Sequence, residues 1–212
     1  MATLSAPLPQ RTRIQQANER KILDAALEAF GRYGYRGATI EQIAGLAEMS
    51  KPNLLYYFHD KQTLYAAVLS RTLETWLDPL KELDPAGDPL EEIWAYMRNK
   101  LEMSRLHPAE SRLFAMEILQ GATVIRGLLE TRLKDLVDER ARIIRRWIDE
   151  GRLAAVDPHH LFFLIWATTQ TYADFWPQIQ VVASNEARSR KKLFRTAEET
   201  LRQVFLNGLK PA

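Results

Sequence analysis

Helix-start signals recur along the sequence and constrain the fold more than any other feature. Thr39-Ile-Glu-Gln42 has the form of a capping box, in which the first and last side chains bond to backbone amides at the start of a helix. Asp88-Pro-Leu-Glu91 and Asp157-Pro158 combine a capping carboxylate with a proline at the first helical position. No segment alternates apolar and polar residues convincingly enough to predict a strand. We therefore predict an all-α fold.

The same signals give approximate boundaries for about nine helices. We expect an N-terminal three-helix domain over residues 1–64 and a larger helical domain over residues 65–212, with residues 11–18 as a mobile polar lead-in. The expected helices cover residues 22–33, 39–47, 51–57, 60–78, a segment from 89 onward, 109–119, 123–150, 157–176 and 187–207, with Gly34, Pro79, Gly151, Pro177 and Gly208 as stop signals.

Segments 39–47 and 51–57 are short helices separated by only a few residues. This is the layout of a helix-turn-helix unit, whose second helix enters the major groove of DNA. The side chains on or after that helix that can reach phosphates or base edges are Lys51, Asn53, Tyr56, Tyr57, His59 and Lys61. The charge gives weak support, because residues 1–65 hold eight basic and six acidic residues while the rest is neutral overall. Ordinary packing of two short helices is the alternative explanation.

Residues 37–64 read GATIEQIAGLAEMSKPNLLYYFHDKQTL and resemble the DNA-binding signature of TetR-family transcriptional regulators. The resemblance covers about residues 18–65 and implies double-stranded operator DNA as a partner. It implies phosphate contacts by Thr39, Tyr57 and Lys61 and base or near-base contacts by Lys51, Asn53 and Tyr56, while Ser50 also matches the family pattern.

Some residues depart from that pattern. Glu48 stands where the family usually has glycine, which predicts an altered turn or about 1 kcal/mol of strain. His59 replaces a usual proline and adds a donor for a phosphate. Arg11 and Arg13 form either a basic arm for the minor groove or a solvated tail.

Residues 65–212 carry no sequence motif for phosphate binding, dinucleotide binding or zinc proteolysis. His159 and His160 are adjacent and diverge by about 100° on a helix, so they cannot chelate one metal together. The chain has no cysteine. We therefore expect no metal, no cofactor and no enzymatic activity. The longest apolar run, residues 161–167, is too short for a membrane span, and we expect a cytoplasmic protein.

Polar residues share helix faces with tryptophans in this larger domain. Trp166, Gln170 and Asp174 are spaced for one face of a helix, and Trp76 belongs to an apolar stripe that begins at Tyr65. The tryptophans are explained equally well as core residues. Gln170 and Asp174 are not, because polar groups that face a core need partners. We predict that Trp76, Trp166, Gln170 and Asp174 line a small-molecule site.

Several stretches of the chain resemble pyrimidine-utilisation regulators within the TetR family. They are residues 53–58, 76–80, 111–117, 157–161 and 165–175. The resemblance implies a ligand such as uracil or thymine and release from operator DNA when that ligand binds. A TetR-type sensor of another small aromatic or apolar compound is the first alternative. A helical enzyme or lipid-binding module is the alternative from another class.

The last helix carries a continuous apolar stripe. Its members are Leu193, Phe194, Ala197, Leu201, Val204 and Phe205. A stripe this wide either covers the core of its own domain or meets its copy across a two-fold axis. We favour a dimer built from the last two helices, because a helix-turn-helix reader needs two copies to span two half-sites.

Overall fold

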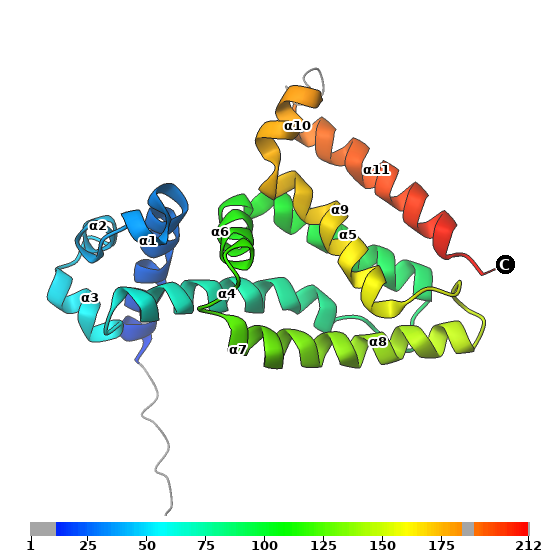
Figure 1. Ribbon diagram of the computed structural model, residues 1–212, viewed down its shortest axis with the longest axis horizontal. Helices are drawn as coiled ribbons and strands as arrows, with labels where there is room; N and C mark the ends of the chain where they lie inside the picture. The colour runs from blue at the N-terminus through cyan, green and yellow to red at the C-terminus, as the bar shows by residue number, and fades with distance from the viewer. Residues whose placement is uncertain (1–11, 184–188, 212) are drawn as a thin grey trace, which may run out of the picture. The chain divides into compact units, whose positions relative to one another are not determined.

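A computed structural model of the chain describes residues 12–183 and 189–211, whose regular structure is helical throughout, as predicted (Figure 1). The chain divides into two compact units, residues 1–68 and 69–212, so the expected boundary after residue 64 falls just before the observed one. Helix α4 (Lys61–Lys81) runs through this boundary, and each unit is described by itself.

The first unit contains the predicted helix-turn-helix. It consists of α1 (Arg13–Gly37), α2 (Ile40–Leu46), α3 (Lys51–Tyr57) and the first part of α4. Its core is formed by side chains that are completely buried, among them Ile22, Ala26, Phe30, Ile43 and Leu54. Asp60 caps α4 through a 2.7 Å hydrogen bond from the Thr63 amide, as the sequence indicated.

Helix α1 begins earlier than its apolar pattern predicted. Thr12 and Gln15 form a capping box, with the Gln15 amide donating to the Thr12 hydroxyl and the Thr12 amide to the Gln15 side chain. The expectation of a mobile lead-in is therefore wrong for residues 13–18, whereas Arg11 lies outside the described residues. Gly34 does break the helix, because its φ of 68° is left-handed.

The second unit packs its helices around one core. After α4 come α5 (Pro89–Leu106), α6 (Pro108–Leu119), α7 (Arg126–Leu128), the π-helix η1 (Leu129–Leu133), α8 (Lys134–Asp149), α9 (Pro158–Asp174), α10 (Trp176–Val182) and α11 (Arg190–Leu209). Helix α5 packs against both α9 and α11, and α9 also contacts α6 and α8 (Figure 1). Ile93, Met97, Ile144, Trp147 and Phe162 are buried at the centre of this arrangement.

Three of the expected stop signals do not end helices. Pro79 lies inside the last turn of α4, and Gly208 lies inside α11. Pro177 sits in the first turn of α10, where its missing N–H costs nothing, and α9 ends before it at Asp174. Gly151 has a φ of 70° and ends α8 as predicted.

The single helix predicted over residues 123–150 forms from Arg126 to Asp149, where α7, η1 and α8 follow one another without a break, so it begins three residues later than expected and contains a π-helical segment. A left-handed connection precedes it at Gly121 and Ala122, whose φ values are 93° and 54°. The carboxylate of Glu117, which is 3% exposed, accepts a 2.8 Å hydrogen bond from the Val124 amide and fixes this connection. A π-helix is a rare departure from α geometry and is frequent at functional sites.

Candidate functional site

The helix-turn-helix unit places two predicted DNA contacts at helix starts. The Thr39 hydroxyl accepts from the Gln42 amide at 3.2 Å, and the Gln42 side chain accepts from the Thr39 amide at 2.9 Å. Ser50 caps α3 by accepting from the Asn53 amide at 3.3 Å. A hydroxyl that accepts from an amide still has its own proton to donate. Both residues are exposed and can therefore serve as caps and as phosphate ligands.

The turn between α2 and α3 shows the departure expected at Glu48. Glu48 has a φ of 49°, the left-handed conformation that glycine adopts most easily. Its carboxylate lies 2.6 Å from the Lys21 ammonium, and the hydrogen bond from Lys21 lowers its pKa. Both side chains are exposed, so this pair adds little stability.

Helix α3 presents several predicted readers to solvent. Asn53, Tyr56 and His59 are exposed, and Tyr56 most clearly, at 73%. Lys51 is also exposed, but its ammonium lies 2.5 Å from the Glu41 carboxylate. The hydrogen bond from Lys51 holds the pKa of Glu41 below its usual range. Any contact between Lys51 and DNA therefore competes with this ion pair.

Two further side chains that were predicted to contact DNA form hydrogen bonds with other residues of the same unit. The Tyr57 hydroxyl accepts from the Asn18 amide nitrogen at 3.0 Å. Lys61 donates to the Ala38 carbonyl at 3.0 Å and lies 4.8 Å from the centre of the Tyr35 ring. These contacts orient both side chains, while their roles toward DNA stay predictions.

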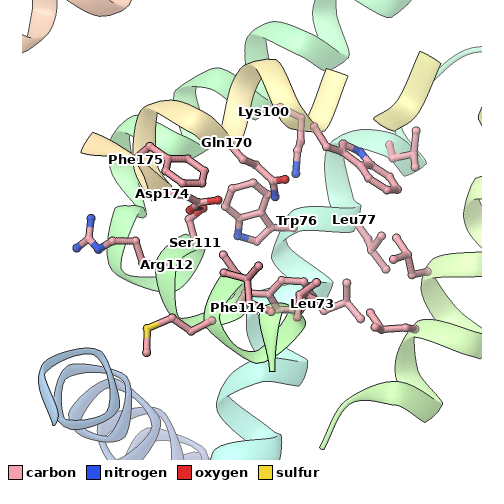
Figure 2. A pocket seen from close by; sticks show the side chains of 18 of the residues that line it. Leu73, Trp76, Leu77, Lys100, Ser111, Arg112, Phe114, Gln170, Asp174 and Phe175 are labelled. Carbon is pink, nitrogen blue, oxygen red and sulfur yellow. Dashed lines mark hydrogen bonds between the residues drawn. The ribbon is translucent and has the colours of Figure 1, made fainter. Parts of the chain in front are cut away.

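The second unit encloses a cavity of about 610 Å³. Its walls come from α4, α5, α6, η1 and α9, and they include all four residues predicted to bind a ligand: Trp76, Trp166, Gln170 and Asp174 (Figure 2). Most of the lining is apolar. This combination of apolar walls with a few convergent polar groups is typical of small-molecule sites.

Two hydrogen bonds beside the cavity join α6 to α9. The Ser111 hydroxyl donates to Asp174 Oδ1 at 2.5 Å, and Arg112 donates to the Ala173 carbonyl at 3.3 Å. Burial raises the pKa of Asp174 against the opposing effect of the Ser111 hydrogen bond. The carboxyl group is thus positioned by a neighbour yet costly to ionise.

Lys100 is a cavity residue that the sequence reasoning missed. It is 3% exposed, and its ammonium nitrogen lies 3.6 Å from the centre of the Trp76 ring. Burial lowers its pKa well below the usual value, although the charge of Asp174 acts in the opposite direction. The signal was present in the sequence, because Lys100 shares an apolar helix face with Ile93 and Met97.

The two remaining predicted residues differ in how they are held. Trp166 donates its indole N–H to the Tyr96 hydroxyl at 2.8 Å, so its ring is fixed. Gln170 is half-buried in the wall, and within the part of the chain that the structure describes its amide has no hydrogen-bond partner. Figure 2 shows Gln170 and Lys100 directed toward Trp76. Gln170 is therefore available to a ligand.

Helix α11 places most of its apolar stripe inside its own domain. Leu193, Phe194, Ala197 and Leu201 belong to the core cluster and are at most 9% exposed. Phe205 is partly buried against this core, and Val204 is 63% exposed. Most of the stripe thus covers the domain's own core. The part of α11 that is left for the expected dimer contact is its exposed margin around Val204.

The described residues contain no cluster of three or more metal-ligating side chains, and His159 instead lies 2.9 Å from the Asp138 carboxylate. No helix among residues 12–183 and 189–211 is long and apolar enough to cross a membrane.

A helix-turn-helix unit followed by a helical domain with a ligand-sized cavity defines a DNA-binding transcriptional regulator. Residues 22–68 match the bacterial regulatory proteins of the tetR family, and residues 69–212 match the C-terminal region of YcdC-like proteins. The chain belongs to the TetR family, which consists of transcriptional regulators and not of enzymes. TetR regulators bind operator DNA and small effectors.

The chain is similar to the HTH-type transcriptional regulator RutR of Escherichia coli (strain K12), with 45% identity over 202 residues that cover 95% of each chain. Among solved structures it is similar to a TetR-like regulator from Rhodococcus sp. RHA1, with a TM-score of 0.64, 22% identity, and 94% and 100% of the two chains covered. AibR in complex with isovaleryl coenzyme A and operator DNA matches with a TM-score of 0.61, 20% identity, and 74% and 85% covered. Both structures show the shared fold.

Proposed function

We propose that this regulator senses a free pyrimidine, uracil or thymine, and acts as a repressor that leaves its operator when the base binds. Its targets are then genes of pyrimidine and nitrogen metabolism. The observation that carries the proposal is the extent of the similarity to RutR, 45% identity over 95% of both chains, which leaves little of the cavity-bearing unit outside the match. The stretches that resemble pyrimidine-utilisation regulators include three of the four predicted cavity residues in one segment, 165–175.

The polar groups of the cavity suit the edge of a pyrimidine. The ring presents N–H and C=O groups side by side in one plane, and the amide of Gln170 offers an acceptor and a donor in the same arrangement. Lys100 supplies a donor for a second ring carbonyl, and Asp174 supplies an acceptor for a ring N–H. Trp76 and Trp166 add flat apolar surface for the ring face.

Release from DNA follows if ligand and operator favour different states of a homodimer. A ligand shifts such an equilibrium only by its difference in affinity for the two states. Thr39, Lys51, Asn53 and Tyr56 are the proposed centre of the DNA contact, and the exposed margin of α11 around Val204 is the proposed contact between the two copies. Weaker DNA binding in the presence of the base then implies equally weaker base binding in the presence of DNA.

Calorimetry with uracil, thymine and uridine tests the proposal. We expect micromolar or tighter binding of the two free bases and none of the ribonucleoside. Gln170→Leu should weaken base binding about tenfold or more, because a buried donor and acceptor are lost. Gln178→Leu changes an exposed glutamine on α10, outside the cavity, and should leave the affinity unchanged. Wild-type affinity in Gln170→Leu would contradict the assigned site, and the absence of heat with both bases would contradict the pyrimidine effector.

A further inference from the structure

The cavity is larger than a free pyrimidine requires. Its volume of about 610 Å³ lies in the range of cavities that enclose whole drug-sized molecules. A pyrimidine base is a single ring, and on the proposed function its hydrogen-bonding groups pair with Gln170, Lys100 and Asp174, which all line the cavity. A base held by these groups therefore leaves much of the cavity empty.

The remaining part of the cavity is apolar. Leu73 and Leu77 from α4 and Leu129 and Leu133 from η1 line it. Figure 2 shows Asp174 and Ser111 on one side of Trp76 and Leu77 on the other, so the polar and apolar parts are separated along the cavity. An apolar space of this kind gives water few hydrogen-bond partners, and its walls lack dispersion contacts when it is empty.

The rim of the apolar part is also apolar. Met116, Ile118 and Leu119 at the end of α6 line the cavity although they are 42%, 41% and 83% exposed. They lie beside the left-handed Gly121–Ala122 connection that leads to the π-helix wall. The solvent-exposed side of the cavity therefore carries apolar side chains as well.

We propose that the cavity binds pyrimidines that carry an apolar alkyl or aryl substituent more tightly than it binds the free base. The ring occupies the end formed by Gln170, Lys100 and Asp174, and the substituent lies against the leucines of α4 and η1. This inference rests on the proposed function, because it takes the pyrimidine ring as the polar part of the ligand.

Calorimetry with two series of ligands, 5-alkyluracils and 6-alkyluracils from ethyl to butyl, tests the proposal beside the free bases uracil and thymine. In the series that directs the chain toward the leucines, affinity should rise about fourfold per methylene until the apolar part is filled. If uracil binds and both series stay flat or weaken, this inference is overturned and the proposed function stands. If the alkyluracils bind and neither uracil nor thymine does, the free-base effector is overturned and the inference is supported. If none of these ligands binds, both the proposed function and this inference are overturned.

A variant that fills the apolar part locates the substituent. Leu129→Trp should remove the gain with chain length and leave the affinity for uracil within about twofold. Leu106→Trp is the matched control, because Leu106 is 55% exposed on α5 and does not line the cavity. It should keep both affinities. A full chain-length gain in Leu129→Trp would overturn the placement against η1, and the uracil titration shows in the same experiment that the variant is folded.

Discussion

The ammonium nitrogen of Lys100 lies 3.6 Å from the centre of the Trp76 ring, inside the cavity of the second unit. Lys100 is 3% exposed, so its charge is held away from water over the face of an aromatic ring. A tryptophan face stabilises a desolvated cation by about 2 kcal/mol, much less than its full hydration. The unliganded protein therefore carries an unfavourable group at the place where we expect the ligand to bind.

Lys100→Met should stabilise the unliganded protein and weaken uracil binding. The pKa of Lys100 is lowered in the folded state, so the unfolded state binds its proton more strongly and the wild-type free energy of unfolding rises with pH toward 10.5. The gain in stability in Lys100→Met should be largest at acidic pH, below the lowered pKa of Lys100, and should shrink as pH rises toward 10.5. Urea unfolding at several pH values measures it. A destabilised variant at pH 7 would show that Lys100 is better solvated than its burial indicates.

Asp174→Asn should remove a pH dependence of stability that runs opposite to the one caused by Lys100. Burial raises the pKa of Asp174 above its unfolded value of 3.8, so its stabilising contribution is complete below that pH and is lost as pH rises through the raised pKa. The wild type should lose stability over this interval relative to the variant, in which the residue does not titrate. Thermal unfolding between pH 3.5 and 7 tests this, and parallel curves for the two proteins would contradict it.

Glu48→Gly should be more stable than Glu48→Ala by about 1 kcal/mol. Both variants lose the ion pair with Lys21, and only glycine relieves the left-handed backbone at this position. The difference in free energy of unfolding between the two variants thus measures the backbone strain at residue 48. The difference between Glu48→Ala and the wild type measures the contribution of the ion pair. Urea unfolding measures all three, and equal stability of the two variants would argue against strain in the turn.

Asn53→Ala should reduce discrimination between operator and random DNA, because a base contact is worth about 1–3 kcal/mol of specificity. Lys51→Ala should weaken both complexes, and the operator complex by the larger factor, because Lys51 is a proposed base or near-base contact whose charge also attracts the phosphates of any duplex. Fluorescence anisotropy with a selected operator and a random duplex separates the two effects. Equal losses on both duplexes in Asn53→Ala would remove that residue from the base contacts.

Local signals predicted the fold well where a helix start is decided by neighbouring residues. The Thr39–Gln42 capping box and the Asp88 and Asp157 caps form as the sequence indicated. Prolines and glycines near helix ends were less informative, because Pro177 suits the first turn of a new helix as well as the end of the preceding one. The helix predicted over residues 123–150 begins late, at Arg126, because the connection before it depends on Glu117, which lies outside that segment.

The candidate ligand site was predicted only in part. Gln170 and Asp174 are recognisable as polar residues on the face of a single helix, and both line the cavity. Ser111 joins Asp174 across 63 residues of sequence, so no local pattern announces the contact. The α11 stripe was ambiguous for a related reason, since an apolar face looks the same whether its own chain or a second copy covers it.

The ion pair between Lys51 and Glu41 gives the DNA-reading helix a counterion of its own. A lysine that meets a phosphate normally sheds a dissolved anion and frees a cation from the DNA, and this exchange makes binding weaken as salt rises. The proposed contact of Lys51 with DNA would instead exchange one carboxylate, attached to the same chain, for a group of the DNA. On this proposal the protein gives up some affinity for DNA in general, and a contact that forms only when the correct sequence aligns the helix favours the operator over the bulk of the genome.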